Sequence, residues 1–311
     1  MATAAPAPAP SLDSACDQLI QYRQRPLLVM YYPETSYMTE PDVRDAYDEL
    51  RRGGCTKEAP IPELDLLIHT NGGDPLAAYR IAQTIRKMAN GLAVLVPERA
   101  YSAGTLLSFA GDSVRLGDGA GLSPIDITLN ESHSDEGVQL AAIDSFMEFA
   151  QKARKQIEEL FQKLDCKRAK SCVDSDLLVQ MVQQVGALTV GRYYRERLIT
   201  GHYAEILLDN YMLNGISNGT DRRNDVIRKF LLSAPSHDFH LDYRLCALWH
   251  LVVEEMPTQE SDLAGNVIGT LGVFTGNGSI CLRLNNRMRM PFIRFYPFTL
   301  PSGGGPNASA A

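Results

Sequence analysis

Short apolar runs alternate with longer amphipathic segments through the first 127 residues of the chain. The apolar runs predict β-strands at residues 26–32, 64–68, 92–96, 114–116 and 122–127. The segments between them carry apolar residues at helical spacing and predict helices at 41–52, 75–88 and 103–110. Strands that alternate with helices in this way are typical of an α/β fold with a largely parallel sheet.

The pattern changes to helix after residue 138, where apolar side chains from Ile143 to Leu164 form one long stripe at helical spacing. Further helices are expected at residues 174–184, 190–199, 204–212, 222–231 and 243–254. The last apolar region, 266–298, is interrupted by the turn sequence Gly-Asn-Gly at 276–278, which favours a β-hairpin. This pattern predicts the following divisions: a core over 21–165, a helical region over 166–256, a β extension over 257–300, and disordered Ala/Pro-rich and Gly-rich tails over 1–20 and 301–311.

Composition limits the classes of partner. The chain is 45% hydrophobic and 22% charged, as in ordinary globular proteins, and its net charge of −7 argues against nucleic acid as the main partner. It has no run of eighteen apolar residues and no secretion-type leader, so we expect no membrane span and a cytoplasmic protein. The six cysteines lack metal-ligand spacing, and neither a dinucleotide nor a P-loop motif is present, so no metal or cofactor is expected.

Two segments near the ends of neighbouring strands carry candidate chemistry. Ser102 follows one strand and opens a helix, and its neighbours Ala103 and Gly104 are small. A serine at such a strand-to-helix turn can present its hydroxyl as a nucleophile. Gly72 and Gly73 follow the preceding strand, where either backbone N–H, together with that of Ala103, could form an oxyanion hole. The pattern therefore indicates acyl-transfer chemistry.

Four motifs occur in order: HTNGGDP at 69–75, VP at 96–97, AYSAGTL at 100–106 and LSPID at 122–126. Over roughly residues 26–165 the chain resembles the Clp protease/crotonase fold, and within it the serine dehydrogenase proteinase family, which is related to signal peptide peptidase A. The resemblance implies an α/β fold with ββα-like repeats, a helical region and a C-terminal β extension. It also implies a hydrolase, a serine peptidase that cleaves peptide bonds through an acyl-enzyme.

The resemblance leaves the general base to be assigned. Clp proteases carry a histidine about 25 residues after the serine, but here the nearest, His133, falls in a polar loop. The signal peptide peptidase relatives use a lysine instead. On the expected long helix, Lys152 lies at the flank of the apolar stripe, whereas Lys155 faces away from it, so Lys152 is the preferred base. To act as a base the Lys152 amine must be neutral at working pH. Its reference pKa near 10.4 must therefore be lowered, which requires burial of the amine away from solvent.

The roles of Asp126 and His237 remain open. Asp126 either orients the base or caps a turn after Pro124. His237, in Ser-His-Asp at 236–238, more simply belongs to a capped turn than to a catalytic trio, because adjacent residues rarely converge on one hydroxyl.

Alternatives to a Ser102–Lys152 peptidase are a crotonase-type enzyme acting on acyl thioesters and a catalytically silent scaffold of the same fold. For the peptidase, we expect a peptide or protein substrate, and ATP hydrolysis would need a separate partner because the chain has no P-loop. Proteins of this fold commonly associate, and the apolar 266–298 segment suggests a surface for homo-oligomerisation.

Overall fold

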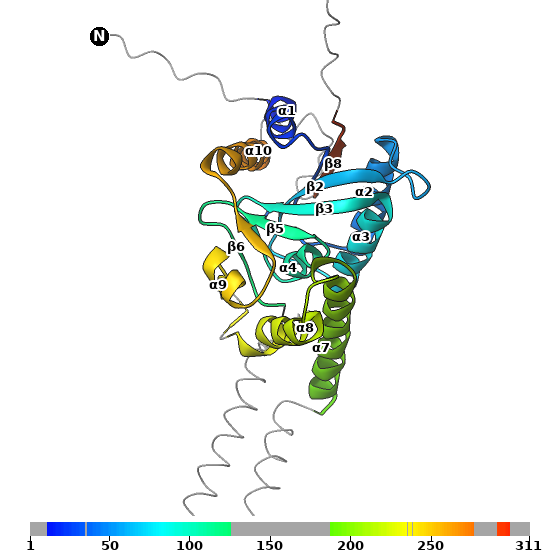
Figure 1. Ribbon diagram of the computed structural model, residues 1–311, viewed down its shortest axis with the longest axis vertical. Coiled ribbons are helices and arrows are strands. Elements are labelled where there is room, and N and C mark those ends of the chain that lie inside the picture. Colours follow the sequence, from blue (N-terminus) through cyan, green and yellow to red (C-terminus); the bar gives the residue numbers. More distant parts are fainter. Residues whose placement is uncertain are drawn as a thin grey trace, which may run out of the picture.

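A six-stranded sheet forms the centre of the computed structural model, which describes residues 11–34, 36–125, 187–234, 236–237, 239–276 and 291–298. Its strand order is β7-β5-β3-β2-β1-β8, and Figure 1 labels β5, β3, β2 and β8 of this sheet. The strands are β1 (Leu27–Tyr31), β2 (Ile61–His69), β3 (Ala89–Val96), β5 (Ser113–Leu116), β7 (Val253–Glu255) and β8 (Phe292–Tyr296). The first five of these pair in parallel, while β8 runs antiparallel to β1 at the edge. The prediction of an α/β fold is therefore confirmed.

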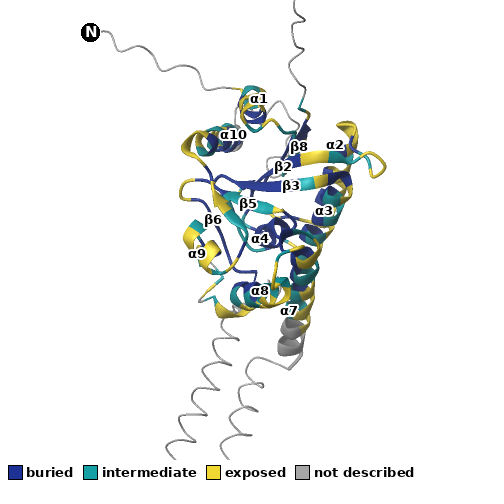
Figure 2. Cartoon of the chain, in the orientation of Figure 1, coloured by how far each residue is buried: buried dark blue, intermediate teal, exposed yellow. Residues whose placement is uncertain are grey.

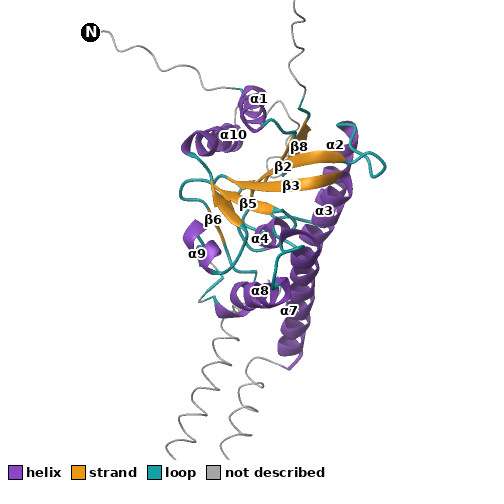
Figure 3. Ribbon diagram, in the orientation of Figure 1, coloured by secondary structure: helices purple, strands orange, loops and turns teal. Residues whose placement is uncertain are grey.

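Helices cover both faces of this sheet, as Figure 3 shows. The helices that the structure describes are α1 (Leu12–Arg23), α2 (Glu40–Arg52), α3 (Pro75–Met88), α4 (Ala103–Ser108), α7 (Ala187–Leu207), α8 (Gly219–Arg228), α9 (Tyr243–Leu248) and α10 (Thr258–Gly276). Two π-helical turns, Leu208–Met212 and Lys229–Ser233, extend α7 and α8. A small pair of parallel strands, β4 (Arg99–Ala100) and β6 (Gly121–Leu122), lies beside the sheet.

The two faces follow from the alternation of side chains along each strand. In β1, Leu27 and Val29 pack with α1 and α10, whereas Leu28 and Met30 belong to the larger core that includes α2, α3 and α4. The fully buried run in β1 is therefore the mark of a strand covered on both sides. Figure 2 shows the buried sheet between helices whose outer faces are exposed.

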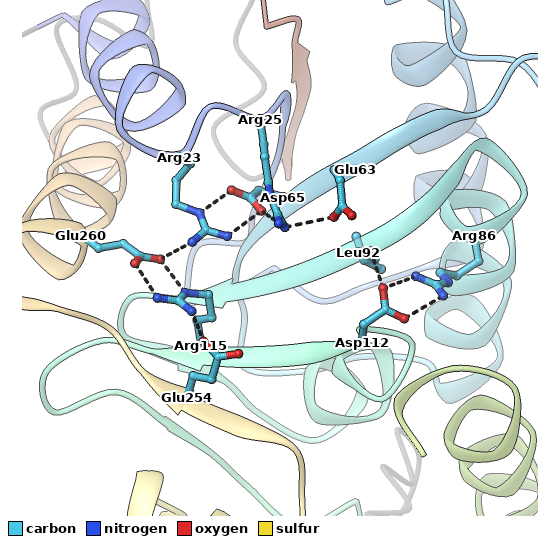
Figure 4. A network of polar contacts seen from close by, with 10 residues as sticks. All are labelled: Arg23, Arg25, Glu63, Asp65, Arg86, Leu92, Asp112, Arg115, Glu254 and Glu260. Atoms are coloured by element: carbon cyan, nitrogen blue, oxygen red, sulfur yellow. Dashed lines mark hydrogen bonds and ion pairs between the residues drawn. The ribbon is translucent and has the colours of Figure 1, made fainter. Parts of the chain in front are cut away.

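An ionic network ties α1 and α10 to the sheet (Figure 4). Arg23 Nε lies 2.7 Å from Asp65 Oδ2, and another guanidinium nitrogen of Arg23 lies 3.3 Å from Glu260 Oε1. Glu260 also receives two hydrogen bonds of 2.7 Å from Arg115. Asp65 and Glu260 are each 1% exposed, so these arginines supply the partners that buried carboxylates require.

Two expectations for the ends of the chain were wrong. Residues 12–20, expected in a disordered tail, belong to α1, whose buried residues include Cys16, Leu19 and Ile20. Residues 258–276, expected in the β extension, form α10, because Ala264, Val267, Ile268 and Leu271 repeat at helical rather than strand spacing. Only Phe292–Tyr296 of the expected hairpin is a strand among the residues described.

Further boundaries also differ. The helices expected at 190–199 and 204–212 are one continuous helix, α7, followed by a π-helical turn. The helix expected at 243–254 ends at Leu248, and Val253–Glu255 instead extends the sheet beside β5. The long helix expected from 143 to 164 lies outside the described residues.

Candidate active site

The loops that follow β2 and β3 lie side by side because parallel strands end at the same edge of a sheet. Thr70 N–H donates to Arg99 O at 3.1 Å, and Tyr101 N–H donates to Thr70 O at 3.0 Å. These two bonds fix the glycine segment after β2 against the segment that carries Ser102.

Ser102 occupies a strained turn. Gly104 N–H donates to Tyr101 O at 2.7 Å, and Ser102, at the second position of this turn, has φ 50° and ψ −113°. These angles are those of a type II′ turn, a position that favours glycine. A side chain in such a conformation is held there by its surroundings at a cost of about 1–3 kcal/mol. Ser102 is partly exposed, and its hydroxyl forms no hydrogen bond with any residue that the structure describes.

Ser123 holds this turn from the other side. Its buried Oγ accepts the N–H of Ser102 at 2.7 Å and donates to Pro124 O at 3.1 Å. Thr105 Oγ1, in the first turn of α4, accepts Ser123 N–H at 3.1 Å and lies 2.8 Å from Ala100 O. The LSPID motif therefore contributes a residue that supports the main chain of Ser102, a role that the sequence reading missed.

Neither Gly72 nor Gly73 has room for a side chain, and Gly72 lies directly against Ser102. A Cβ at Gly72 would lie 2.9 Å from Ser102 Cβ and 3.4 Å from its Oγ, and one at Gly73 would collide with the Met38 main chain. Both glycines have positive φ, 119° and 149°. Gly72 N–H donates to Thr70 Oγ1 at 2.9 Å, whereas the N–H groups of Gly73 and Ala103 take no partner from the described part of the chain.

Most residues considered as the base or its partner are not among those that the structure describes. Asp126, His133, Lys152 and Lys155 are all outside the described residues. His237 lies in the turn before α9.

A histidine from the same loop as His237, His240, contacts the residue that precedes Ser102. His240 Nδ1 lies 3.1 Å from the Tyr101 hydroxyl, and the His240 ring packs over Gly121. The bridge between Leu122 and Leu241 places this loop beside β6. The sequence offered no signal for this pairing, because 139 positions separate the two residues.

His69, the last residue of β2, is a buried neutral imidazole. It stacks on Tyr31 with ring centroids 5.0 Å apart, and its side chain is 4% exposed. Its Nδ1 lies 3.2 Å from Glu98 Oε2 in a geometry that forms no hydrogen bond. Burial, with a smaller contribution from the charge of Arg99, lowers the pKa of His69 to about 4. His69 is therefore uncharged at neutral pH.

We expect His69 to make stability depend on pH. The unfolded side chain binds a proton below its ordinary pKa near 6.5, but the folded one does so only near 4, so stability falls as pH decreases through this window. Lowering the pH from 7.5 to 5 should cost about 2 kcal/mol of unfolding free energy through His69. Urea unfolding at both pH values measures this cost.

A matched pair of variants isolates the effect. His69→Gln should flatten the pH dependence by that amount, and His202→Gln, at a position 71% exposed, serves as the surface control. Equal pH dependence in the wild type and the His69 variant would show that His69 does not titrate abnormally.

The described residues also bear on the expectations for metal ligands, membrane spans and reactive thiols. Among those residues no group of His, Cys, Asp or Glu is arranged to hold a metal ion, and no helix is long and apolar enough to cross a bilayer. The described cysteines Cys16, Cys55 and Cys246 are buried thiols. Burial raises the pKa of each thiol, which disfavours the reactive thiolate.

The geometry defines an α/β protein with a serine at a strained strand-to-helix turn beside a glycine loop. Residues 20–170 match the model of the ClpP-like SDH-type serine proteinase family. This match confirms the resemblance read from the sequence motifs.

Two curated relatives come from Methanocaldococcus jannaschii. Uncharacterized protein MJ0137 is 33% identical over 110 residues, 35% of this chain and 37% of the relative. Uncharacterized protein MJ1495 is 28% identical over 152 residues, 46% of this chain and 50% of the relative. The chain thus matches half or less of the length of these relatives.

A solved structure of a mutant 1510-N membrane-bound stomatin-specific protease also overlaps with the chain. The overlap covers 44% of this chain and 63% of that one, at 14% identity and a TM-score of 0.29. At this level of similarity the superposition gives no information about the site.

Proposed function

We propose that the protein is a serine peptidase in which Ser102 is the nucleophile and an acyl-enzyme is the intermediate. The observation that carries this proposal is the strained turn at Ser102, whose hydroxyl is unpaired within the described residues and lies against a glycine loop. Strain of this kind persists only where the surrounding structure imposes it, and it is concentrated at functional sites.

The oxyanion hole is proposed to consist of Gly73 N–H and Ala103 N–H. Gly72 N–H is the less suitable donor because it already donates to Thr70 Oγ1. In the reaction, Ser102 Oγ attacks the peptide carbonyl, and the carbonyl oxygen becomes an anion that the two N–H groups stabilise. Each such donor typically contributes about 2.7–4 kcal/mol to the transition state.

Lys152 is proposed as the general base. Its neutral amine takes the proton from Ser102 Oγ and passes it to the nitrogen of the leaving amine, so that the peptide bond breaks and an ester to Ser102 remains. Water then attacks this ester, with Lys152 accepting the proton of the water and returning it to Ser102. Asp126 follows Ser123 closely and is a candidate to orient the amine.

A peptide or protein is the proposed substrate, and an activator or a separate ATPase is a possible partner of such a peptidase. The proposed location is the cytoplasm. Homo-oligomerisation stays a prediction, and one argument for it is lost, since Val267, Ile268 and Leu271 are covered by α1 and the sheet of the same chain.

Covalent labelling of the full chain with a fluorophosphonate probe tests this function. The folded protein should take up one label per chain, and peptide mapping should place it on Ser102. A label on another residue, or the absence of labelling in a folded sample, would refute the proposal.

A further inference from the structure

Thr70 lies between the two loops that form the site. It is the residue after β2, is fully buried, and its main-chain N–H and C=O are both bonded to the segment that leads to Ser102. Its side chain makes further hydrogen bonds, to Gly72, that are independent of these main-chain bonds.

The Thr70 hydroxyl holds Gly72 at both ends. Oγ1 accepts Gly72 N–H at 2.9 Å and donates to Gly72 O at 3.2 Å. The Gly72 carbonyl also accepts the N–H of Met38 at 2.9 Å. The Thr70 methyl fills the space beside Gly104 in α4, where a Cβ would collide with it.

The orientation of the Gly72 carbonyl determines the orientation of the proposed oxyanion donor. Gly72 C=O and Gly73 N–H belong to the same planar trans peptide unit, so they point in opposite directions. Both flanking residues are glycines at positive φ, for which many other backbone orientations are open. Hydrogen bonds to Gly72 O are therefore needed to keep this peptide unit from rotating.

We propose that Thr70 is a positioning residue that locks the Gly72–Gly73 peptide unit and so keeps Gly73 N–H directed for oxyanion stabilisation. The proposal rests on the proposed serine peptidase function. The hydroxyl provides the lock and the methyl provides packing, so the two parts of the side chain can be separated by substitution.

The test compares Thr70→Val with Thr70→Ser in the full chain. Valine keeps the shape and loses the hydroxyl, whereas serine keeps the hydroxyl and loses the methyl. The second-order rate of fluorophosphonate labelling should fall about 10- to 100-fold in Thr70→Val and stay within about 3-fold of wild type in Thr70→Ser. Thermal unfolding should show a lowered midpoint for both variants, so the loss of rate would not follow the loss of stability.

Hydrogen exchange of the peptide that contains Gly72 gives a second readout that does not depend on activity. It should become faster in Thr70→Val and remain near wild type in Thr70→Ser. Equal labelling rates and equal exchange in Thr70→Val and wild type would overturn the role of Thr70 alone. Absence of labelling in folded wild type would overturn the peptidase function, and unchanged exchange in Thr70→Val would then overturn the lock as well.

Discussion

Replacing Ser102 with alanine is expected to lower the cleavage of fluorescently labelled casein by about 10⁴-fold or more. The reason is that the proposed acyl-enzyme forms on Ser102 Oγ, and alanine removes this hydroxyl. The unfolding free energy should change by less than about 0.5 kcal/mol, because Ser102 Oγ makes no hydrogen bond with the described residues. Initial cleavage rates and urea unfolding measure the two quantities on the same samples.

Ser102→Gly is the matched control for strain. It should be as inactive as Ser102→Ala, yet about 1 kcal/mol more stable than wild type, because glycine adopts φ 50° and ψ −113° without a Cβ clash. Residual cleavage in both variants at the wild-type rate would remove Ser102 from the mechanism. A glycine variant no more stable than wild type would show that the turn stores no strain.

The second large effect is expected at Lys152. Lys152→Ala should lower activity by about 10²- to 10⁴-fold, the usual contribution of a general base, while Lys155→Ala should be nearly silent. A lysine base works only in its neutral form, so wild-type kcat/KM should rise with pH until the amine has lost its proton. The pH profile of casein cleavage measures this rise.

The two lysine variants would also show which other residue is the general base if Lys152 is not. A strong effect at Lys155 with none at Lys152 would show that the helical phase read from the sequence was incorrect. If both are silent and His237→Ala abolishes activity, the base is a histidine and the lysine mechanism fails.

The central strands and helices of the fold could be predicted because each is encoded by a local pattern of apolar residues. The apolar runs predicted the strands β1, β2, β3 and β5, and the amphipathic segments between them predicted α2, α3 and α4. The two ends of the chain were misread because composition was given more weight than periodicity. The Ala/Pro-rich start obscured α1, and the turn sequence at 276–278 favoured a hairpin over 266–298 although the apolar residues before that turn recur at helical spacing.

The sequence predicted which motifs form the candidate site but not the contacts between their residues. The sequence placed Ser102 and the two glycines after consecutive strands, and parallel pairing brings those loops together. It could not show which glycine N–H is already bonded, because that depends on the side-chain geometry of Thr70. It also gave no sign of the contact of His240 with Tyr101, or of Ser123 with the main chain of Ser102, since both form through folding.

The central claim, an acyl-enzyme on Ser102, is tested most directly by rapid mixing of the full chain with p-nitrophenyl acetate, followed by intact-mass analysis of the quenched protein. The peptidase account predicts a burst of one nitrophenol per chain and an acetyl adduct that maps to Ser102. A crotonase-type enzyme or a silent scaffold of this fold would show neither. A folded protein that gives no burst and no adduct at Ser102 would contradict the account.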